Sequence, residues 1–328
     1  MTTFDQRHLD RCERAASRGD QLDRADLVAL AKAPLHDLAA AANRVRRAQC
    51  GDAFDLCSIV NAKSGRCPEN CAYCAQSRHW SAGVEEYPFR TAADIVAQAK
   101  RDVRAGVQRF SLVASGQRLS RSEVERAALA IAAVKRATGV SVCASLGLLE
   151  KEDFSLLAQA GLERVHNNLE TSRAFFPRIC TTHAYDDKLR AIEAAREAGL
   201  EVCSGGIIGM GESLVDRIDL ALELRALRPN SVPLNVLNPI AGTPLASMPP
   251  LAHDDVLRTV ALFRFALPGT SLRLAGGRAL LGEAGRACLE AGANALISGD
   301  MLTTGGFSVA SDRAMAASAG FSVPDPII

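Results

Sequence analysis

Short apolar runs alternate with longer amphipathic stretches from residue 53 onward. The runs have the length of strands, and the stretches repeat apolar residues three and four positions apart, as helices do. Parallel strands joined by crossover helices produce this rhythm. We expect strands at 54–62, 109–115, 141–147, 164–169, 201–209, 231–237, 271–275 and 293–299, and helices that include 92–104, 122–135, 185–198, 215–227, 254–266 and 282–291.

Eight such units predict an α/β fold, a closed (βα)8 barrel of the TIM type, whose chemistry lies at the carboxyl ends of the strands. Residues 1–52 have a different pattern, with two or three helices rich in Ala, Arg and Asp that Pro34 interrupts. We therefore expect a helical extension at 1–52, the barrel at 53–300, and a segment at 301–328 that contains a short helix and packs on the barrel.

Composition narrows the class of protein. The chain has 328 residues, 48% of them hydrophobic and 23% charged, which is enough to bury a large core. A net charge of +1 with scattered Lys and Arg argues against nucleic acid and anionic membranes as partners. No signal core or long apolar run is seen, so a cytoplasmic location is expected. In a reducing compartment the 10 cysteines favour metal ligation over disulfides.

Cys67, Cys71 and Cys74 follow the first predicted strand in a C-x3-C-x2-C pattern. This spacing indicates an iron–sulfur cluster held by three thiolates, which leaves one iron open to a small molecule. We infer that the molecule is S-adenosylmethionine, because the pattern is the signature of radical S-adenosylmethionine enzymes. That class places a residue such as Tyr73 against the adenine. A zinc knot is the alternative, although zinc usually takes a fourth ligand and C-x2-C pairs.

Three more cysteines fall on alternate predicted strands: Cys57 on the first, Cys143 on the third and Cys203 on the fifth. Alternate strands share a layer of inward side chains, so these thiols are expected to converge below the mouth of the barrel. Arg273 has a comparable position on the seventh strand, and a buried cation needs an anionic partner such as a thiolate–sulfide cluster. The alternative is that the three cysteines are small core residues.

The other cysteines are less informative. Cys180 lies on the loop after the fourth predicted strand, and we expect it to reach the inner cavity from above as an extra ligand. Cys288 on a late helix and Cys12 in the helical extension are predicted to be packing residues, and the role of Cys50 is left open.

Several segments together resemble the biotin synthase family. They are NAKSGRCPENCAYC at 61–74, HNNLETS at 166–172, VCSGGIIGMGE at 202–212, SVPLN at 231–235, GTPL at 242–245, RLAGGR at 273–278 and GDMLTT at 299–304. One motif would be weak, but an ordered set of this length is specific. The resemblance implies that the chain inserts sulfur into dethiobiotin to make biotin, with a 5′-deoxyadenosyl radical and a second iron–sulfur cluster as sulfur donor.

One position departs from the commonest members. They carry a cysteine on the second strand that helps hold a [2Fe–2S] donor cluster, whereas this chain has Ser111. Serine is a poor iron ligand beside three thiols. With Cys57 and Cys180, the change resembles the type II biotin synthases, whose donor is a [4Fe–5S] cluster. We therefore predict that Cys57, Cys143 and Cys203 hold the auxiliary cluster, and that Cys180 or Arg273 completes its surroundings.

The resemblance also implies roles for polar residues at the barrel mouth. Asn168 and Glu170 are expected to meet S-adenosylmethionine, with Glu170 accepting from the ribose hydroxyls. Asn168 and Asn235 are expected to bind the ureido ring of dethiobiotin. Gly205 and Gly206 are expected to bring backbone close to the cofactor. Thr303 and Thr304 are expected to bind the valerate carboxylate of dethiobiotin. The simpler alternatives are a tight turn at the glycines and a helix cap at the threonines.

Two rival functions remain at this point. Radical S-adenosylmethionine enzymes that build thiamine precursors or mature hydrogenases share the first cysteine motif, but they are not expected to combine Asn235 with Cys143, Cys203 and Arg273. A noncatalytic iron–sulfur scaffold would have clusters without a substrate pocket. For a biotin synthase the resemblance implies dethiobiotin as substrate, flavodoxin or ferredoxin as electron donor, the iron–sulfur assembly machinery as partner, and a homodimer.

Overall fold

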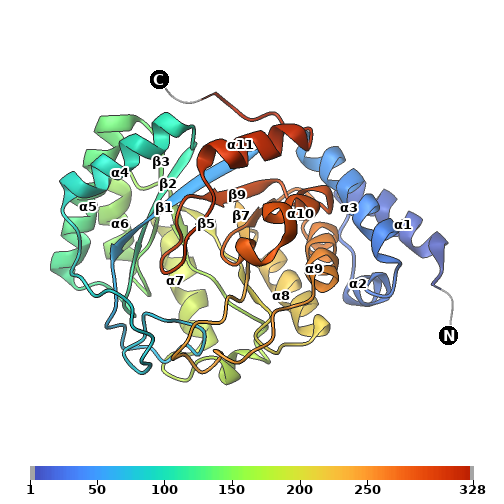
Figure 1. The fold of residues 1–328 in the computed structure, drawn as a ribbon, viewed down its shortest axis with the longest axis horizontal. Helices are drawn as coiled ribbons and strands as arrows, with labels where there is room; N and C mark the ends of the chain where they lie inside the picture. The colour runs from blue at the N-terminus through green and yellow to red at the C-terminus, as the bar shows by residue number, and fades with distance from the viewer. Residues whose placement is uncertain (1–3, 326–328) are drawn as a thin grey trace.

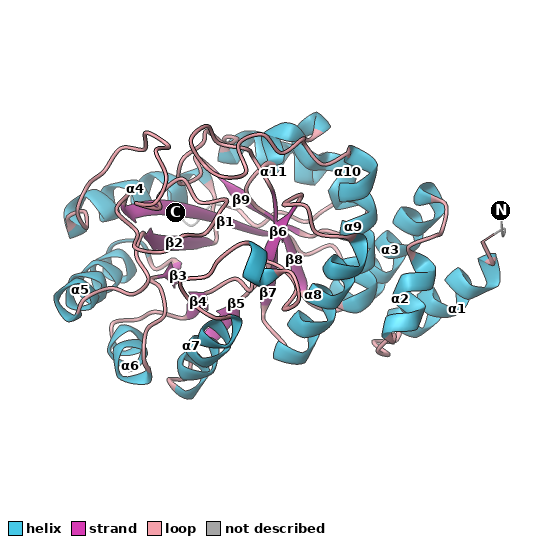
Figure 2. Ribbon diagram, turned by 90° about the horizontal axis from the view of Figure 1, so that it is seen from below, coloured by secondary structure: helices cyan, strands magenta, loops and turns pink. Residues whose placement is uncertain are grey.

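Parallel strands form one sheet that closes on itself, and helices surround it (Figures 1 and 2). The computed structural model describes residues 4–325. The order around the ring is β5, β4, β3, β2, β1, β9, β8, β7 and β6, and β5 also pairs with β7. The predicted (βα)8 barrel is confirmed. Its strands are β1 (Asp55–Lys63), β2 (Arg109–Ala114), β3 (Ser141–Ser145), β4 (Arg164–His166), β5 (Glu201–Cys203), β6 (Gly206–Ile208), β7 (Ser231–Val236), β8 (Ser271–Leu274) and β9 (Ala295–Ser298).

The fifth predicted strand is broken into β5 and β6, which is why the barrel has nine segments instead of eight. Cys203 at the end of β5 pairs with Ser231, and Gly206 at the start of β6 pairs with Leu234 of the same neighbour, β7. The two segments therefore occupy one place in the ring. Gly205 lies at the break, where its N–H donates to the side chain of Asn168 instead of to a strand.

The crossover helices begin and end at residues that satisfy their free backbone groups. Thr91 caps the start of α4 by accepting from Asp94 N, and Gly106 ends it at φ 109°, a left-handed conformation that glycine adopts readily. Ser120 with Glu123 forms a capping box on α5. The helices around the barrel are α4 (Ala92–Ala105), α5 (Arg121–Thr138), α6 (Lys151–Gln159), α7 (Tyr185–Glu197), α8 (Leu214–Leu227), α9 (His253–Ala266) and α10 (Arg286–Glu290).

Three helices precede the barrel, α1 (Gln6–Ser17), α2 (Arg24–Leu30) and α3 (Leu35–Cys50), and they pack against α8 and α9 at one side (Figure 1). Arg24 in α2 pairs with Asp219 in α8 at 2.6 Å. Arg258 in α9 donates to the carbonyls of Ala31 and Ala33. At the other end of the chain, α11 (Val309–Ser318) contacts α4, α10 and β9. No helix among residues 4–325 is long and apolar enough to cross a membrane.

Alternation along the strands separates the packed core from the interior of the barrel. Outward residues such as Leu56, Phe110 and Val142 are fully buried against the helices. Their neighbours Cys57, Ser111 and Cys143 face the interior and line a cavity. The interior therefore carries thiols and polar groups where many barrels of this kind have aliphatic side chains.

Candidate active site

The C-x3-C-x2-C loop follows β1 at the carboxyl end of the barrel, as predicted. Cys67 N donates to Gln76 O at 3.0 Å, and Arg78 N donates to Cys67 O at 2.9 Å, so the loop folds back on itself. Cys74 N donates to Cys71 O at 3.0 Å and forms a tight turn between these two ligand positions. The sequence therefore places three thiols on one short, internally bonded loop.

A second loop, residues 179–183, holds the cysteine loop in place. Ala72 N donates to Ile179 O at 2.8 Å. The side chain of Asn70 donates to Thr181 Oγ1 at 2.7 Å and accepts from Thr181 N at 3.0 Å. Because backbone and side-chain bonds both join the loops, the position of Cys71 depends on the conformation of the loop after β4.

Burial changes the acidity of the loop thiols. It raises the pKa of Cys74 to about 11 and also raises the pKa of Cys67. The pKa of Cys71 is raised chiefly by its contact with Cys180, and then by burial. Iron binds thiolates, so cluster binding has to displace protons from these three groups.

Tyr73 lies between the cysteine loop and an apolar patch at the mouth of the barrel. The patch consists of four buried residues, Phe175, Ile179, Met210 and Leu237, and Tyr73 packs against it. Tyr73 also lines the cavity. A flat aromatic ring beside an apolar patch is a suitable surface for a purine, and the contact of Tyr73 with the adenine stays a prediction.

Glu170 and Asn168 lie together where β4 ends, and both line the cavity. Asn168 Nδ2 donates to Glu170 Oε2 at 3.4 Å, while Asn168 Oδ1 accepts from Gly205 N at 3.0 Å. Lys188 Nζ, on α7, is 4.0 Å from Glu170 Oε1. Glu170 has a φ of +73°, and residues held in this left-handed region often belong to functional sites. Sequence reasoning missed Lys188, because nothing in the pattern of α7 distinguishes it.

Gly205 and Gly206 have a packing reason to be glycine. A Cβ at Gly205 would lie 1.9 Å from Pro233 O, and one at Gly206 would lie 2.5 Å from Glu170 O. Glycine at these two positions thus allows close contact with the backbone of Pro233 and Glu170. Neither glycine lines the cavity, so their predicted contact with the cofactor remains a prediction.

Cys57, Cys143 and Cys203 meet in the interior, as predicted from their places on alternate strands. All three are buried and line one cavity of about 340 Å³ that also reaches Cys74 and Tyr73 at the mouth. Burial raises the pKa of Cys57 to about 11 and of Cys143 to about 12. His166 Nδ1 is 3.5 Å from Cys203 Sγ, and burial lowers the pKa of this histidine to about 4. His166 was not identified from the sequence.

Three arginines line the same interior, of which the sequence predicted only Arg273. Arg273 donates to Asp55 Oδ2 at 2.5 Å and to Leu296 O at 2.6 Å. Arg164 donates to Glu201 at 2.8 Å. Arg109 has two buried guanidinium nitrogens, Nε and Nη1, without a hydrogen-bond partner. In strand register Arg109 is opposite Cys57, and Arg164 is opposite Cys143, so cations and thiols alternate around the interior.

The four substrate-binding candidates, Asn168, Asn235, Thr303 and Thr304, lie nearer the mouth and all line the cavity. Asn235 Oδ1 accepts from Gly276 N at 2.8 Å and its Nδ2 donates to Gly206 O at 3.1 Å, which leaves one N–H and one lone pair free. Thr303 and Thr304 lie in a bend whose Met301 N donates to Thr304 O. They do not cap a helix, because Ser308 is the cap of α11.

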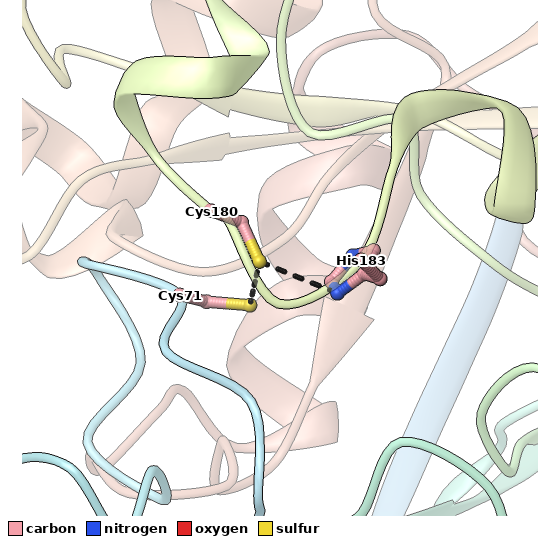
Figure 3. Close-up of side chains that lie close together, drawn as sticks. All are labelled: Cys71, Cys180 and His183. Atoms are coloured by element: carbon pink, nitrogen blue, oxygen red, sulfur yellow. Dashed lines mark hydrogen bonds between the residues drawn. The ribbon is translucent and has the colours of Figure 1, made fainter.

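Cys180 does not lie with the inner thiols. Its Sγ is 3.7 Å from Cys71 Sγ, and the cavity lining does not include it (Figure 3). The expectation that Cys180 reaches the inner cavity from above is therefore corrected. The reason is that the 179–183 loop bonds to Asn70 and Ala72, which turns Cys180 toward the cysteine loop. Cys288 and Cys12 are buried in the core, as predicted.

Comparison with known proteins decides between the alternatives. Residues 62–224 match the radical SAM superfamily model, and residues 233–322 match the biotin and thiamin synthesis associated domain. Biotin synthase 2 of Corynebacterium diphtheriae is 52% identical over 95% of this chain and 94% of its own length. Biotin synthase of Brachyspira hyodysenteriae is 48% identical over 96% of this chain and 95% of its own length. The chain belongs to the biotin synthase family. Membership confirms a radical S-adenosylmethionine enzyme and implies a [4Fe–4S] cluster with S-adenosylmethionine.

Solved structures agree on the fold. Methylornithine synthase superposes with a TM-score of 0.83 over 96% of this chain and 98% of its own, at 19% identity. The FeFe-hydrogenase maturase HydG from Carboxydothermus hydrogenoformans superposes with a TM-score of 0.80 over 96% of this chain and 79% of its own, at 17% identity. At this identity the likeness concerns the barrel alone. Since biotin synthases match at far higher identity, the rival assignments to an enzyme that builds thiamine precursors, to a hydrogenase maturase and to a noncatalytic scaffold are set aside.

The residues of this biotin synthase family member fit iron–sulfur clusters at both ends of the cavity. At the mouth, three thiols on one loop supply the ligand set of a cluster with one open iron. In the interior, Nε and Nη1 of Arg109 make no hydrogen bond, and Nη1 has only a long ion pair with Glu163 Oε2 at 4.0 Å, so a bound anionic group would supply acceptors that these cationic donors lack. A cluster of thiolates and sulfides has that charge. The interior therefore suits an iron–sulfur cluster because of Arg109 as well as because of the three cysteines.

Proposed function

We propose that the chain converts dethiobiotin to biotin as a type II-like biotin synthase. The observation that carries the proposal is the single cavity, which is lined by Cys74 and Tyr73 at one end and by Cys57, Cys143 and Cys203 at the other. Sulfur insertion requires a substrate to reach a radical source and a sulfur source in one place. When bound, the mouth cluster and S-adenosylmethionine supply the 5′-deoxyadenosyl radical, and the auxiliary cluster supplies the sulfur.

At the mouth the chain positions the cofactor. We assign Cys67, Cys71 and Cys74 to the [4Fe–4S] cluster, and Tyr73 with its apolar patch to the adenine. Glu170 accepts from the ribose hydroxyls, and its carboxylate is oriented by Asn168 Nδ2 at 3.4 Å and by Lys188 at 4.0 Å. Since the radical removes hydrogen from carbon, no side chain has to act as acid or base; positioning and exclusion of water are the contribution of the protein.

Deeper in the cavity the chain holds the substrate between the two clusters. The free N–H and lone pair of Asn235 suit the ureido group of dethiobiotin, and Asn168 faces the same space. Thr303 and Thr304 offer hydroxyls to the valerate carboxylate at the mouth. The walls between them are apolar and include Ile59, Val113, Ile207 and Val236, as the carbon skeleton of dethiobiotin requires.

In the interior, Cys57, Cys143 and Cys203 are assigned to the auxiliary cluster, with Arg273 and Arg109 as its cationic surroundings. We favour [4Fe–5S] over [2Fe–2S], because Ser111 lines the cavity at the position where a fourth thiol would be needed for the smaller donor. Cys180 is left out of this set because its sulfur faces Cys71. Flavodoxin or ferredoxin as reductant, the iron–sulfur assembly machinery and a homodimer stay predictions from the family resemblance.

The proposal is tested with anaerobically purified enzyme by Mössbauer spectroscopy, iron counting and turnover with a reductant, S-adenosylmethionine and dethiobiotin. We expect biotin, 5′-deoxyadenosine and about eight irons per chain in two cubane-type clusters. A cubane with a [2Fe–2S] signal would overturn the type II assignment and retain the function. A lone cubane with no biotin would overturn sulfur insertion by this chain.

A further inference from the structure

Four potential metal ligands converge beside the cysteine loop, outside the cavity. Cys180 Sγ lies 3.7 Å from Cys71 Sγ and 3.3 Å from His183 Nδ1 (Figure 3). These three ligand atoms lie within 4.8 Å of one another. Glu69 adds a fourth, since its Oε2 contacts His183 Nδ1 and is 3.9 Å from Cys180 Sγ. Two sulfurs and one imidazole nitrogen therefore form one close group, and the carboxylate oxygen of Glu69 adjoins it on the side of Cys180 and His183.

The group is partly to fully buried, and one of its nitrogens has no hydrogen-bond partner. The side chains of His183 and Glu69 are 6% and 8% exposed. His183 Nδ1 has both a carboxylate and a thiol as neighbours, while its buried Nε2 has no hydrogen-bond partner. Around Cys180 Sγ the other polar atoms are Asn70 Oδ1 at 3.4 Å and Thr182 Oγ1 at 3.5 Å. Protons on the thiols and on His183 Nδ1 link these atoms in the ion-free chain, and a metal ion at the centre would take the place of those protons.

We propose that Cys71, Cys180, His183 and Glu69 bind one divalent ion of the Zn²⁺, Fe²⁺ and Co²⁺ class in the cluster-free chain. Sulfur, imidazole and carboxylate in a four-ligand set suit a tetrahedral ion of this class, and exclude Mg²⁺ and Ca²⁺, which prefer oxygen. The site uses Cys71, which is also a ligand position of the C-x3-C-x2-C loop. The mononuclear ion and the [4Fe–4S] cluster therefore exclude each other.

Because the ion and the cluster share Cys71, the ion can occupy its site only before the cluster is assembled. Iron or zinc held at the site lies beside the loop that binds the cluster, and either ion withholds Cys71 until it leaves. The inference uses only the assignment of the loop cysteines. It does not depend on sulfur insertion or on the auxiliary cluster, so failure of one leaves the other unaffected.

Titration of the full-length, iron-free chain with Co²⁺ under anaerobic conditions tests the site. We expect one equivalent to bind, with thiolate-to-cobalt charge transfer and the d–d bands of a tetrahedral ion. Cys180→Ser and His183→Gln should each weaken binding by at least about 10-fold. Cys12→Ser is the matched control, because Cys12 lies with His8 and Asp26 in the other mixed sulfur, nitrogen and carboxylate group of the described residues. Binding in Cys12→Ser should equal that of the parent chain.

A double variant separates this site from the loop motif. Cys67→Ser with Cys74→Ser leaves all four proposed ligands intact, so tight Co²⁺ binding should persist. If binding is lost in the double variant and retained in Cys180→Ser, the ion is held by the motif thiols and the proposal is overturned. Absence of tight binding to the parent chain, or its loss in Cys12→Ser alone, would also overturn it. Circular dichroism of each variant verifies folding.

Discussion

Arg273 donates a hydrogen bond to Asp55 Oδ2 at 2.5 Å, which links β8 to the first residue of β1 across β9. Arg273 is buried, and this carboxylate is the negative group that offsets its charge in the iron-free barrel. The same guanidinium donates to Leu296 O in the strand between them. One side chain thus ties three neighbouring strands together beside the inner thiols.

Asp55→Asn should lower the free energy of unfolding by about 1–3 kcal/mol at neutral pH, because Arg273 stays buried without its anionic partner. Burial raises the pKa of Asp55, but the nearby arginines, Arg273 first, bring it below its ordinary value on balance. The stabilisation is therefore complete above the unfolded pKa of about 4 and is lost as pH falls through the lower folded pKa. Urea unfolding from pH 7 to pH 3 measures this.

The control for this variant is Asp20→Asn, which removes an exposed ion pair with Arg18. Its effect should stay below about 1 kcal/mol. An Asp55→Asn variant whose deficit is the same at pH 7 and pH 3 would show that the carboxylate charge does not stabilise Arg273.

Cys57→Ala should abolish the auxiliary cluster and reduce iron from about eight to about four per chain, with the Mössbauer signal of the mouth cluster retained. Ser111→Ala is the matched variant, because Ser111 lines the same cavity but is not expected to bind iron. It should keep the full iron content. Unchanged iron in Cys57→Ala, or a loss in Ser111→Ala, would contradict the ligand set.

Arg109→Met should have opposite effects on the iron-free and iron-loaded chains. Arg109 Nε and Nη1 are buried without a hydrogen bond, and the ion pair of Nη1 with Glu163 is long at 4.0 Å, so removal of these groups should leave the stability of the iron-free chain equal or higher. The reconstituted variant should retain less inner iron, because a cation beside the cluster is lost. Arg164→Met provides the contrast, since Arg164 is paired with Glu201 and its loss should cost about 1 kcal/mol even without iron. Equal unfolding curves for these two variants would contradict the distinction.

Gly205→Ala should destabilise the chain by about 3 kcal/mol or more, because the new methyl group would meet the carbonyl oxygen of Pro233. Gly282→Ala is the control: a Cβ there would meet no atom within 4 Å, so the change should stay within about 0.5 kcal/mol. Urea unfolding of the iron-free chains compares them. A Gly205→Ala variant as stable as Gly282→Ala would mean that β5 and β7 can move apart at little cost.

The periodic pattern predicted the strands and helices well, because each barrel unit buries one face and the spacing of apolar residues reports that face directly. The break between β5 and β6 was not predictable in this way. It depends on Gly205 bonding to Asn168 and approaching Pro233, and both partners are distant in sequence. A local pattern holds no information about such tertiary contacts.

Site residues could be located from the sequence where their type and spacing are distinctive. They were missed where only the folded structure brings them to the site. Cys67, Cys71 and Cys74 have a diagnostic spacing, and the inner thiols fall on alternate strands. Arg109 carried a usable signal, since it lies two residues before Ser111 and so points to the same side of β2. No sequence signal indicated where Cys180 would lie. Its orientation depends on hydrogen bonds between Asn70 and Thr181, which join two loops that are distant in sequence.

The unpaired guanidinium nitrogens of Arg109 have a consequence for the lifetime of the protein in a cell. An anion bound in the barrel satisfies donors that the polypeptide alone leaves unsatisfied, so loading and conformational stability are linked. Chains made during iron shortage would open more often and be degraded sooner than loaded ones. Iron supply would then set the abundance of the enzyme as well as its activity.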